Sequence, residues 1–328
     1  MTLLFGQSTT ASGASNVMNP AISANGLFLG VAHNPISDEE TNGFKIQEME
    51  LQFTSIVDPF FKADVVMALH PPHDEDHHGM SIDIEEGYLM FQSLPRGFGL
   101  RTGKFLLPFG KHNSLHTHQT PFVNAPIGVE DIFGHHAAAD VGFELSYSIP
   151  LPWYSEILGI LIDGDANELF DKESNQPATG GRFSNLWDIS DNSTIEFGSS
   201  VLYGPKDENS IITLYGADFT FKWKDIRKVY GKAFTWQNEF LSYANGDHAG
   251  FYSIIQYKFT RRWWTSAGFS QAIEEKTSEY KTQIAFVPSE FSAVRLELVY
   301  TDFENGDANI AVYLQMNFTI GSHPAHKY

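Results

Sequence analysis

The sequence contains no cysteine in its 328 residues, which excludes disulfide bonds and thiolate metal sites. Positive charge is scarce, because 21 Lys and Arg face 40 Asp and Glu, giving a formal net charge of −19. A chain this acidic is poorly suited to neutralising phosphates, so we expect no nucleic-acid partner. Long hydrophobic runs are also missing. One of the longer apolar runs, Ile157–Ile162, falls far short of the roughly 18 residues that a transmembrane helix needs.

Aromatic residues are abundant at 14% of the chain, and many recur at every second position. Between residues 215 and 223, outward Tyr215, Phe219, Phe221 and Trp223 alternate with inward glycine and polar residues, and residues 310–320 alternate in the same way. A period of two indicates β-strands. Charged, amide and glycine residues in the second set are typical of a water-filled barrel interior. A soluble β-sandwich or propeller is the alternative.

The alternation predicts about sixteen strands, an even number, as bacterial barrels require. They form one all-β domain, a transmembrane antiparallel β-barrel over residues 26–320, with an N-terminal extension at 1–25 and a C-terminal tail at 321–328. The predicted strands are 26–34, 43–57, 60–70, 81–93, 97–107, 140–149, 153–163, 182–189, 193–204, 211–224, 230–243, 249–260, 263–273, 278–287, 291–303 and 309–320.

The connections between these strands alternate in length. Short turns such as Asp58–Pro59 and Arg261–Arg262 alternate with mostly longer, acidic loops, of which 108–139 is the longest. This predicts a barrel in the bacterial outer membrane, with short periplasmic turns and both termini periplasmic. All but one of the six tryptophans lie beside the short turns, where indoles favour the membrane interface and would form a girdle: Trp153, Trp187, Trp223, Trp263 and Trp264.

Three stretches carry a resemblance to known proteins. The segment RTGKFLLPFG, Arg101–Gly110, resembles the G-(K/Q)-F-x-x-P-F-G stretch of the phosphate-selective porin superfamily. NPAISANGLFLG near the start and GSHPAHKY at the end resemble a branch of outer-membrane proteins that often carry the name zinc-regulated outer-membrane receptor. The resemblance covers most of the chain and implies a barrel of porin type, with Arg101, Lys104 and Phe109 in the matching motif. Porins of about this size are commonly homotrimers, an arrangement that the residues leave open.

Charged residues at inward strand positions are the predicted lining of the pore. Such a set either selects ions or forms a salt-bridged wall that only maintains the barrel. Glu86 and Tyr88 fall on the opposite register from Glu85, which suggests a β-bulge at this point. The predicted lining is Glu48, Glu50, Asp83, Glu85, Arg101, Lys104, Asp218, Lys222, Arg295 and Glu297.

Histidines and carboxylates cluster in two of the long loops. Imidazole with carboxylate suits Zn²⁺, Cu²⁺ or Ni²⁺, so a divalent-metal site at the outer loops is one interpretation, and solvated acidic loops are the other. We expect no obligatory cofactor. The candidate ligands are His73, Asp74, Asp76, His77, His78, His112, His116, His118, His135 and His136.

The 108–139 loop carries apolar residues that an exposed loop would not favour, among them Phe122, Ile132 and Phe133. We therefore expect it to fold inward and narrow the lumen. The predicted function is passive diffusion of small solutes or ions across the outer membrane, with a divalent-metal role left open. One alternative is a structural or adhesive barrel. A distant one is a rim hydrolase with Ser114 beside His112 and His116, but no ordered triad spacing is present, and we predict no enzyme.

Overall fold

Sixteen antiparallel strands close into one barrel in the computed structural model, which describes residues 20–34, 42–71, 80–166, 169–170, 176–207, 210–226, 231–246 and 248–321. Every predicted strand is present. The strands are β1 (Ala21–His33), β2 (Gly43–Ile56), β3 (Phe61–His70), β4 (Ser81–Phe91), β5 (Phe98–Leu106), β6 (Ala139–Ser148), β7 (Tyr154–Ile162), β8 (Ala178–Ser190), β9 (Ser193–Asp207), β10 (Ser210–Lys224), β11 (Ala233–Tyr243), β12 (Ala249–Lys258), β13 (Trp263–Ala272), β14 (Thr277–Ser289), β15 (Ser292–Asp302) and β16 (Ala308–Gly321).

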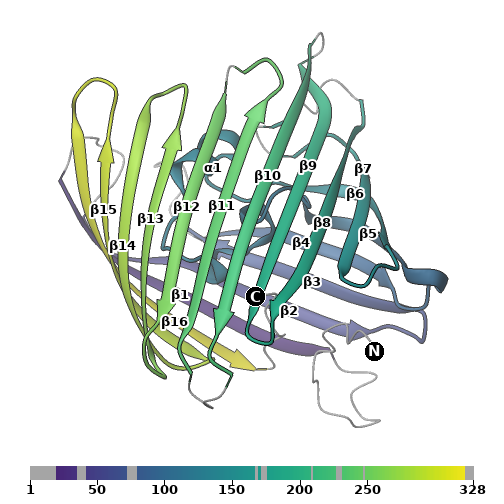
Figure 1. Cartoon of the computed structure of the whole chain (residues 1–328), viewed down its shortest axis with the longest axis horizontal. Coiled ribbons are helices and arrows are strands. Elements are labelled where there is room, and N and C mark those ends of the chain that lie inside the picture. Colours follow the sequence, from purple (N-terminus) through teal and green to yellow (C-terminus); the bar gives the residue numbers. More distant parts are fainter. Residues whose placement is uncertain are drawn as a thin grey trace.

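The barrel closes through β1, which pairs with β2 on one side and with β16 on the other. Ser23 pairs with Gly321, so the wall extends slightly beyond the predicted 26–320 at both ends. Because the strand number is even, β1 starts and β16 ends at the same edge of the barrel (Figure 1). We call this edge the short-turn rim and the opposite edge the long-loop rim.

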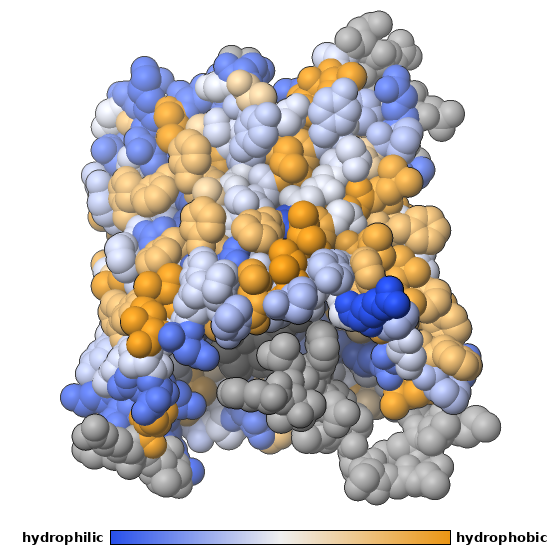
Figure 2. All heavy atoms as spheres, turned by 45° about the vertical axis from the view of Figure 1, so that its right-hand side comes forward, coloured by the Kyte–Doolittle hydropathy of each residue, from blue (hydrophilic) through white to orange (hydrophobic). Residues whose placement is uncertain are grey.

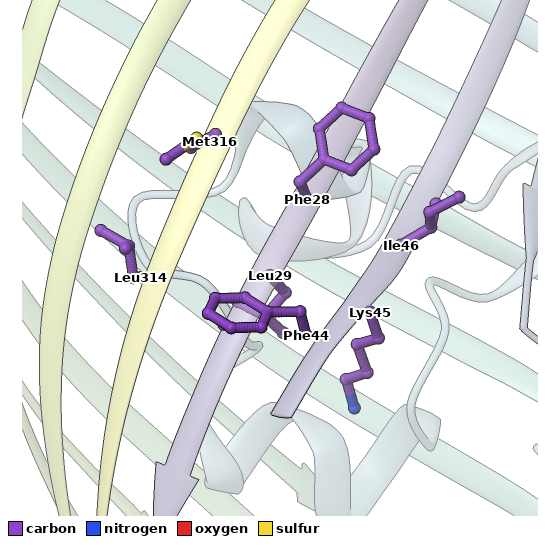
Figure 3. Close-up of a pocket in the computed structure, with 8 residues that line it drawn as sticks. Phe28, Leu29, Phe44, Lys45, Ile46, Leu314 and Met316 are labelled. Atoms are coloured by element: carbon purple, nitrogen blue, oxygen red, sulfur yellow. The ribbon is translucent and has the colours of Figure 1, made fainter. Parts of the chain in front are cut away.

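The outer face of the wall is apolar. Ile310, Met316 and Ile320 alternate along β16 and are 50%, 49% and 63% exposed, as the period of two predicts. On the side shown in Figure 2, hydrophobic residues spread over the wall and hydrophilic ones gather toward its upper and lower edges. A groove of about 370 Å³ crosses β16, β1 and β2 on the outer face, and Phe44, which lines it, is 93% exposed (Figure 3). A closed sheet leaves no unpaired backbone edge, so this exterior fits the hydrocarbon of a bilayer.

The expected tryptophan girdle is present except at one position. Trp153 and Trp263 are exposed on the outer face near the short-turn rim, and Trp153 packs beside Trp187 with ring centroids 6.3 Å apart. Trp264 was wrongly placed in the girdle. It pairs with Lys258, whose Nζ lies 5.5 Å from the indole, on the inner face, because neighbours in a strand point to opposite sides of the sheet.

A β-bulge in β4 changes which carboxylates reach the lumen. Val66 pairs with Glu86 and Met67 with Ile84, so Glu85 is the extra residue, as the sequence suggested. The bulge lets Glu85 and Glu86 both approach His116, one at each ring nitrogen. Without it, consecutive side chains would point to opposite faces.

Residues 107–138, which join β5 to β6, lie inside the ring of strands, and we call them the inner segment. They include one short helix, α1 (Ile127–Phe133), and two turns of 3-10 helix at His112–Ser114 and Thr117–Gln119. Figure 1 shows α1 behind β11 and β12, within the barrel. In the part of the chain that the structure describes, no helix is long and apolar enough to cross a membrane.

Candidate constriction of the channel

The two ends of the inner segment are tied together where it leaves the wall. The backbone N–H of Leu107 donates to the carbonyl of Ala138 over 2.8 Å. The Asn113 amide lies between these residues, donating to both carbonyls at 2.8 and 3.0 Å and accepting from the Ala138 N–H at 2.7 Å. Asn113 is 1% exposed, so these bonds form away from water. The two ends of the inner segment are therefore held together, and we call Leu107, Asn113 and Ala138 the neck of the loop.

A buried glutamate on β11, Glu239, accepts hydrogen bonds from the start of the inner segment. Glu239 Oε2 accepts from the backbone N–H groups of Lys111 and His112, both at 3.0 Å, and from the Tyr252 hydroxyl at 2.9 Å. Lys111 also extends its ammonium group to Glu196 on β9, at 2.6 Å. Irregular backbone inside a barrel needs such partners, and charged acceptors provide stronger bonds than neutral ones.

The far part of the loop is fastened to β14 and β15. Glu297 on β15, 0% exposed, accepts from the Val123 N–H at 2.8 Å. Cations on the same wall donate to loop carbonyls: Lys281 to Ala125 at 2.8 Å and Arg295 to Thr120 at 2.9 Å. The α1 N-terminus is held as well, because the Gly128 N–H donates to Ser270 Oγ at 2.9 Å.

Two phenylalanines of the loop dock against glycines of the wall. A Cβ atom at Gly216 would lie 2.7 Å from the Phe109 ring, and one at Gly268 would lie 2.8 Å from the Phe122 ring. Phe109 is 0% exposed and Phe122 2%, and Val129, Ile132 and Phe133 of α1 are buried with them. The inward folding expected from these apolar residues is thus what the structure shows.

The predicted pore-lining residues face the interior with one exception. Glu48, Glu50, Asp218 and Glu297 are buried against the loop or another wall residue. Arg101 contacts Glu144 at 2.6 Å, and Asp83, although 61% exposed in its side chain, lies 2.7 Å from His70. Those that face inward are Glu48, Glu50, Asp83, Glu85, Arg101, Asp218, Lys222, Arg295 and Glu297.

Lys104 was wrongly placed in the lumen. It pairs with Val141, which is 54% exposed on the outer face, and directly opposed residues share a face of the sheet. Arg101 and Lys104 are separated by an odd number of positions along β5, so only one of them can point inward.

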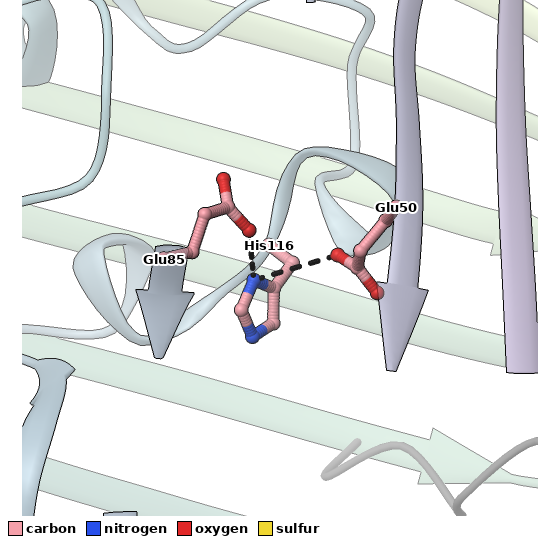
Figure 4. A group of neighbouring side chains, drawn as sticks. All are labelled: Glu50, Glu85 and His116. Carbon is pink, nitrogen blue, oxygen red and sulfur yellow. Dashed lines mark hydrogen bonds and ion pairs between the residues drawn. The ribbon is translucent and has the colours of Figure 1, made fainter. Parts of the chain in front are cut away.

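Two histidines of the loop meet a group of glutamates on β2 and β4. His116 Nδ1 lies 3.0 Å from Glu85 Oε2 and 3.6 Å from Glu50 Oε2 (Figure 4). His116 Nε2 lies 3.1 Å from Glu86 Oε2. His118 Nδ1 lies 3.3 Å from Glu50 Oε2. Burial alone would lower the pKa of His116, but the hydrogen bonds to Glu85 and Glu86 and the nearby carboxylate charges raise that pKa well above its usual value.

The other histidine ligand candidates do not join this group. His112 packs beside Tyr252 with ring centroids 6.1 Å apart, and the exposed His135 pairs with Glu130. His136 lies 5.3 Å from the His70 ring toward the long-loop rim. The candidates His73, Asp74, Asp76, His77 and His78 lie outside the described residues.

The buried His112 makes loop docking sensitive to acid. Burial, with the charge of Lys281, lowers its pKa from 6.5 to about 4. Since the undocked loop binds the proton more readily, docking weakens as pH falls from 6.5 toward 4, by about 3 kcal/mol in total. We expect current noise and protease cleavage within the loop to increase over this range. His112→Asn removes this titration, so the variant should show a smaller increase. An equal increase in both proteins would assign the effect to other groups.

The hydrolase alternative gains no support from the geometry. Ser114 is exposed, whereas His112 is buried beside Tyr252 and both nitrogens of His116 face glutamates. Within the described ranges, no hydrogen bond joins the Ser114 hydroxyl to either histidine. The arrangement instead fixes a loop across a lumen.

Comparison with known proteins agrees with this architecture. No family model matches the chain. The chain is 26% identical over 345 residues to an uncharacterized protein of Aquifex aeolicus (strain VF5), and the alignment covers 88% of this chain and 71% of that protein.

Among solved structures, similar barrels include the anion-selective porin from Comamonas acidovorans, with a TM-score of 0.61 at 9% identity over 92% of this chain and all of that one. Pseudomonas putida OprB in its high-pH structure gives 0.66 at 9% identity, covering 92% and 94% of the two chains. The outer-membrane channel DcaP of Acinetobacter baumannii gives 0.58 at 10% identity, covering 92% and 96%. At these identities the comparison establishes the fold, a sixteen-stranded barrel of the type found in the outer membrane of bacteria.

Proposed function

We propose that this protein is an outer-membrane channel for passive diffusion of small solutes and ions, narrowed by the inner segment. The observation that carries the proposal is the docked loop, whose backbone N–H groups are held by Glu239 on β11 and Glu297 on β15. A barrel of this strand number leaves an aqueous channel unless something fills it. A loop fixed within it sets the size of what passes.

The charges along the path favour cations. Three cations of the interior each lie 2.6 Å from a carboxylate: Arg101 from Glu144, Lys111 from Glu196 and Arg182 from Asp218. Around the loop histidines carboxylates are in excess, because Glu50, Glu85 and Glu86 surround His116 and His118, and the whole chain carries −19. A negative field in a narrow path raises the local cation concentration.

Two finer assignments belong to this proposal. The RTGKFLLPFG motif supports placement near the phosphate-selective porin superfamily, although the acidic interior favours cations over phosphate. A homotrimer is supported by a similar barrel, Vibrio cholerae OmpT, which has been solved in a trimer form and has a TM-score of 0.53 at 8% identity.

Planar-bilayer recording of the purified protein tests both the channel and its selectivity. With EDTA present, we expect a cation-to-anion permeability ratio of about 2–5 at ~0.1 M KCl, falling toward 1 at ~1 M as salt screens the field. Glu85→Gln should lower the ratio. Glu304→Gln removes one charge at the long-loop rim, where Glu304 pairs with Lys276, and should change it less.

The outcomes separate the candidate functions. A preference for anions would contradict the proposal that the charges along the channel favour cations. A folded protein that never forms conducting steps would overturn the channel and favour a structural or adhesive barrel.

A further inference from the structure

His116 presents one ring nitrogen to two carboxylates at once. Its Nδ1 lies 3.0 Å from Glu85 Oε2, on β4, and 3.6 Å from Glu50 Oε2, on β2 (Figure 4). A single N–H can direct its hydrogen to only one of these oxygens. Two carboxylates and an imidazole converging on one point form a better match for a divalent cation, which all three can bind together.

The other nitrogen of His116 is already oriented as a metal ligand requires. Nε2 lies 3.1 Å from Glu86 Oε2, and Glu86 in turn accepts from the Leu106 N–H at 3.0 Å and lies 3.8 Å from Arg101. Metal-binding imidazoles commonly donate their second N–H to a carboxylate, which fixes the ring and increases its basicity. The bulge at Glu85 creates this arrangement, because it lets consecutive glutamates reach opposite sides of one ring.

The spacing of the donor atoms fits a small tetrahedral ion. Ligand oxygens and nitrogens around zinc stand about 3.3–3.5 Å apart, given bonds of roughly 2.0–2.2 Å. The separations from His116 Nδ1 are 3.0 and 3.6 Å, and a second imidazole, His118 Nδ1, lies 3.3 Å from Glu50 Oε2. The ligand atoms of Glu50, Glu85 and His116 all lie within 4.8 Å of one another. Imidazole donors favour zinc-class ions over Ca²⁺ or Mg²⁺.

We infer that Glu50, Glu85 and His116 form a binding site for one zinc-class divalent cation in the constriction. The ion joins the inner segment to β2 and β4, so it occupies the path and fixes the loop across it. The site lies inside the barrel and is built from residues of β2, β4 and the inner segment. The inference extends the proposed function, since the ion sits where permeating ions would pass.

Zinc titration of the full chain tests the site directly. The protein is refolded in detergent and stripped with EDTA, and it carries His73→Asn, His77→Asn and His78→Asn so that these side chains contribute no zinc binding. Calorimetry should show one saturable zinc site per chain. Glu85→Gln and His116→Asn should each remove it. Glu86→Gln leaves Glu50, Glu85 and His116 in place and should weaken it about 10- to 100-fold.

The matched control is His135→Asn, which removes an exposed histidine that pairs with Glu130 away from the cluster. We expect its zinc affinity to equal that of the parent. Cobalt at the site should give the intense visible bands of tetrahedral coordination, a signature that non-specific binding would not produce. Retained heat-modifiable migration on gels shows that each variant is folded.

Three results would overturn the inference: no saturable zinc binding, zinc binding unchanged in both Glu85→Gln and His116→Asn, or equal affinity for zinc and calcium. The proposed function is tested separately by KCl conductance with EDTA. A conducting protein that does not bind zinc refutes only the metal site. Zinc binding that depends on the cluster in a protein that never conducts refutes only the channel.

Discussion

Replacing residues 114–135 by two glycines is expected to raise single-channel conductance about three- to fivefold, because it removes the loop that crosses the lumen. The design keeps the neck. Leu107 and Ala138 are already hydrogen-bonded, and Asn113 stays in place beside them, so a short link closes the gap without straining the wall. The deletion also removes the contact of His116 with Glu85 and that of His118 with Glu50.

The barrel itself should survive the deletion. Each strand pairs with two neighbours around a closed ring, and those bonds do not involve the loop. Glu297 loses its loop donor Val123 but gains access to water in the widened lumen, whereas Glu239 keeps the N–H groups of Lys111 and His112. A matched control shortens the turn Phe303–Asp307 at the long-loop rim, which should leave conductance near that of the parent. If the deleted protein folds and its conductance does not change, the inner segment is not the constriction.

The strands were predictable because membrane contact imposes a strict period of two on the wall. The strand 182–189 is the informative case, since its outward Asn185 interrupts the apolar alternation. The structure explains it: the Trp153 indole N–H donates to Asn185 Oδ1 at 3.1 Å, so the amide is covered on the outer face. A polar residue can occupy a membrane strand where a girdle tryptophan satisfies it.

Two side chains, Lys104 and Trp264, point to the face of the wall opposite to the predicted one. Lys104 and Trp264 were assigned by residue type, one as a pore cation and the other as a girdle indole. Their strand positions oppose both assignments, since Arg101 and Trp263 already occupy the inward and outward positions of the same strands. Counting positions from a residue of known orientation would have corrected each one.

The partners of the inner segment could not be predicted in the same way. Apolar residues such as Phe122 and Phe133 indicated that the loop turns inward, and they are buried there. The acceptors that hold its backbone, Glu239, Glu279 and Glu297, lie on distant strands and carry no local motif. Which inward glutamate meets which loop N–H depends on the three-dimensional path of the loop.

Substituting Gly250 by leucine is expected to displace α1 from the wall. A Cβ at Gly250, on β12, would overlap the backbone carbonyl of Gly128 in α1. A Cβ at Gly128 would in turn lie 2.7 Å from the Phe251 backbone nitrogen, so neither side can yield by moving a flexible side chain. Displacement breaks the Gly128 N–H bond to Ser270 and exposes Ile132 and Phe133, now 4% and 2% exposed. Losing that burial should weaken docking by at least about 3 kcal/mol.

The expected readout is a folded barrel with larger and noisier current steps than the parent, and rapid protease cleavage within residues 125–135. The increase in conductance should be smaller than for the full deletion, because the contacts of His116 and Val123 with the wall remain. Gly159→Leu is the matched control: it faces the outer surface of β7, where the nearest atom to a new Cβ is 3.8 Å away. If Gly250→Leu gives the quiet, protease-resistant channel of the parent, the close packing of α1 on β12 does not hold the loop in place.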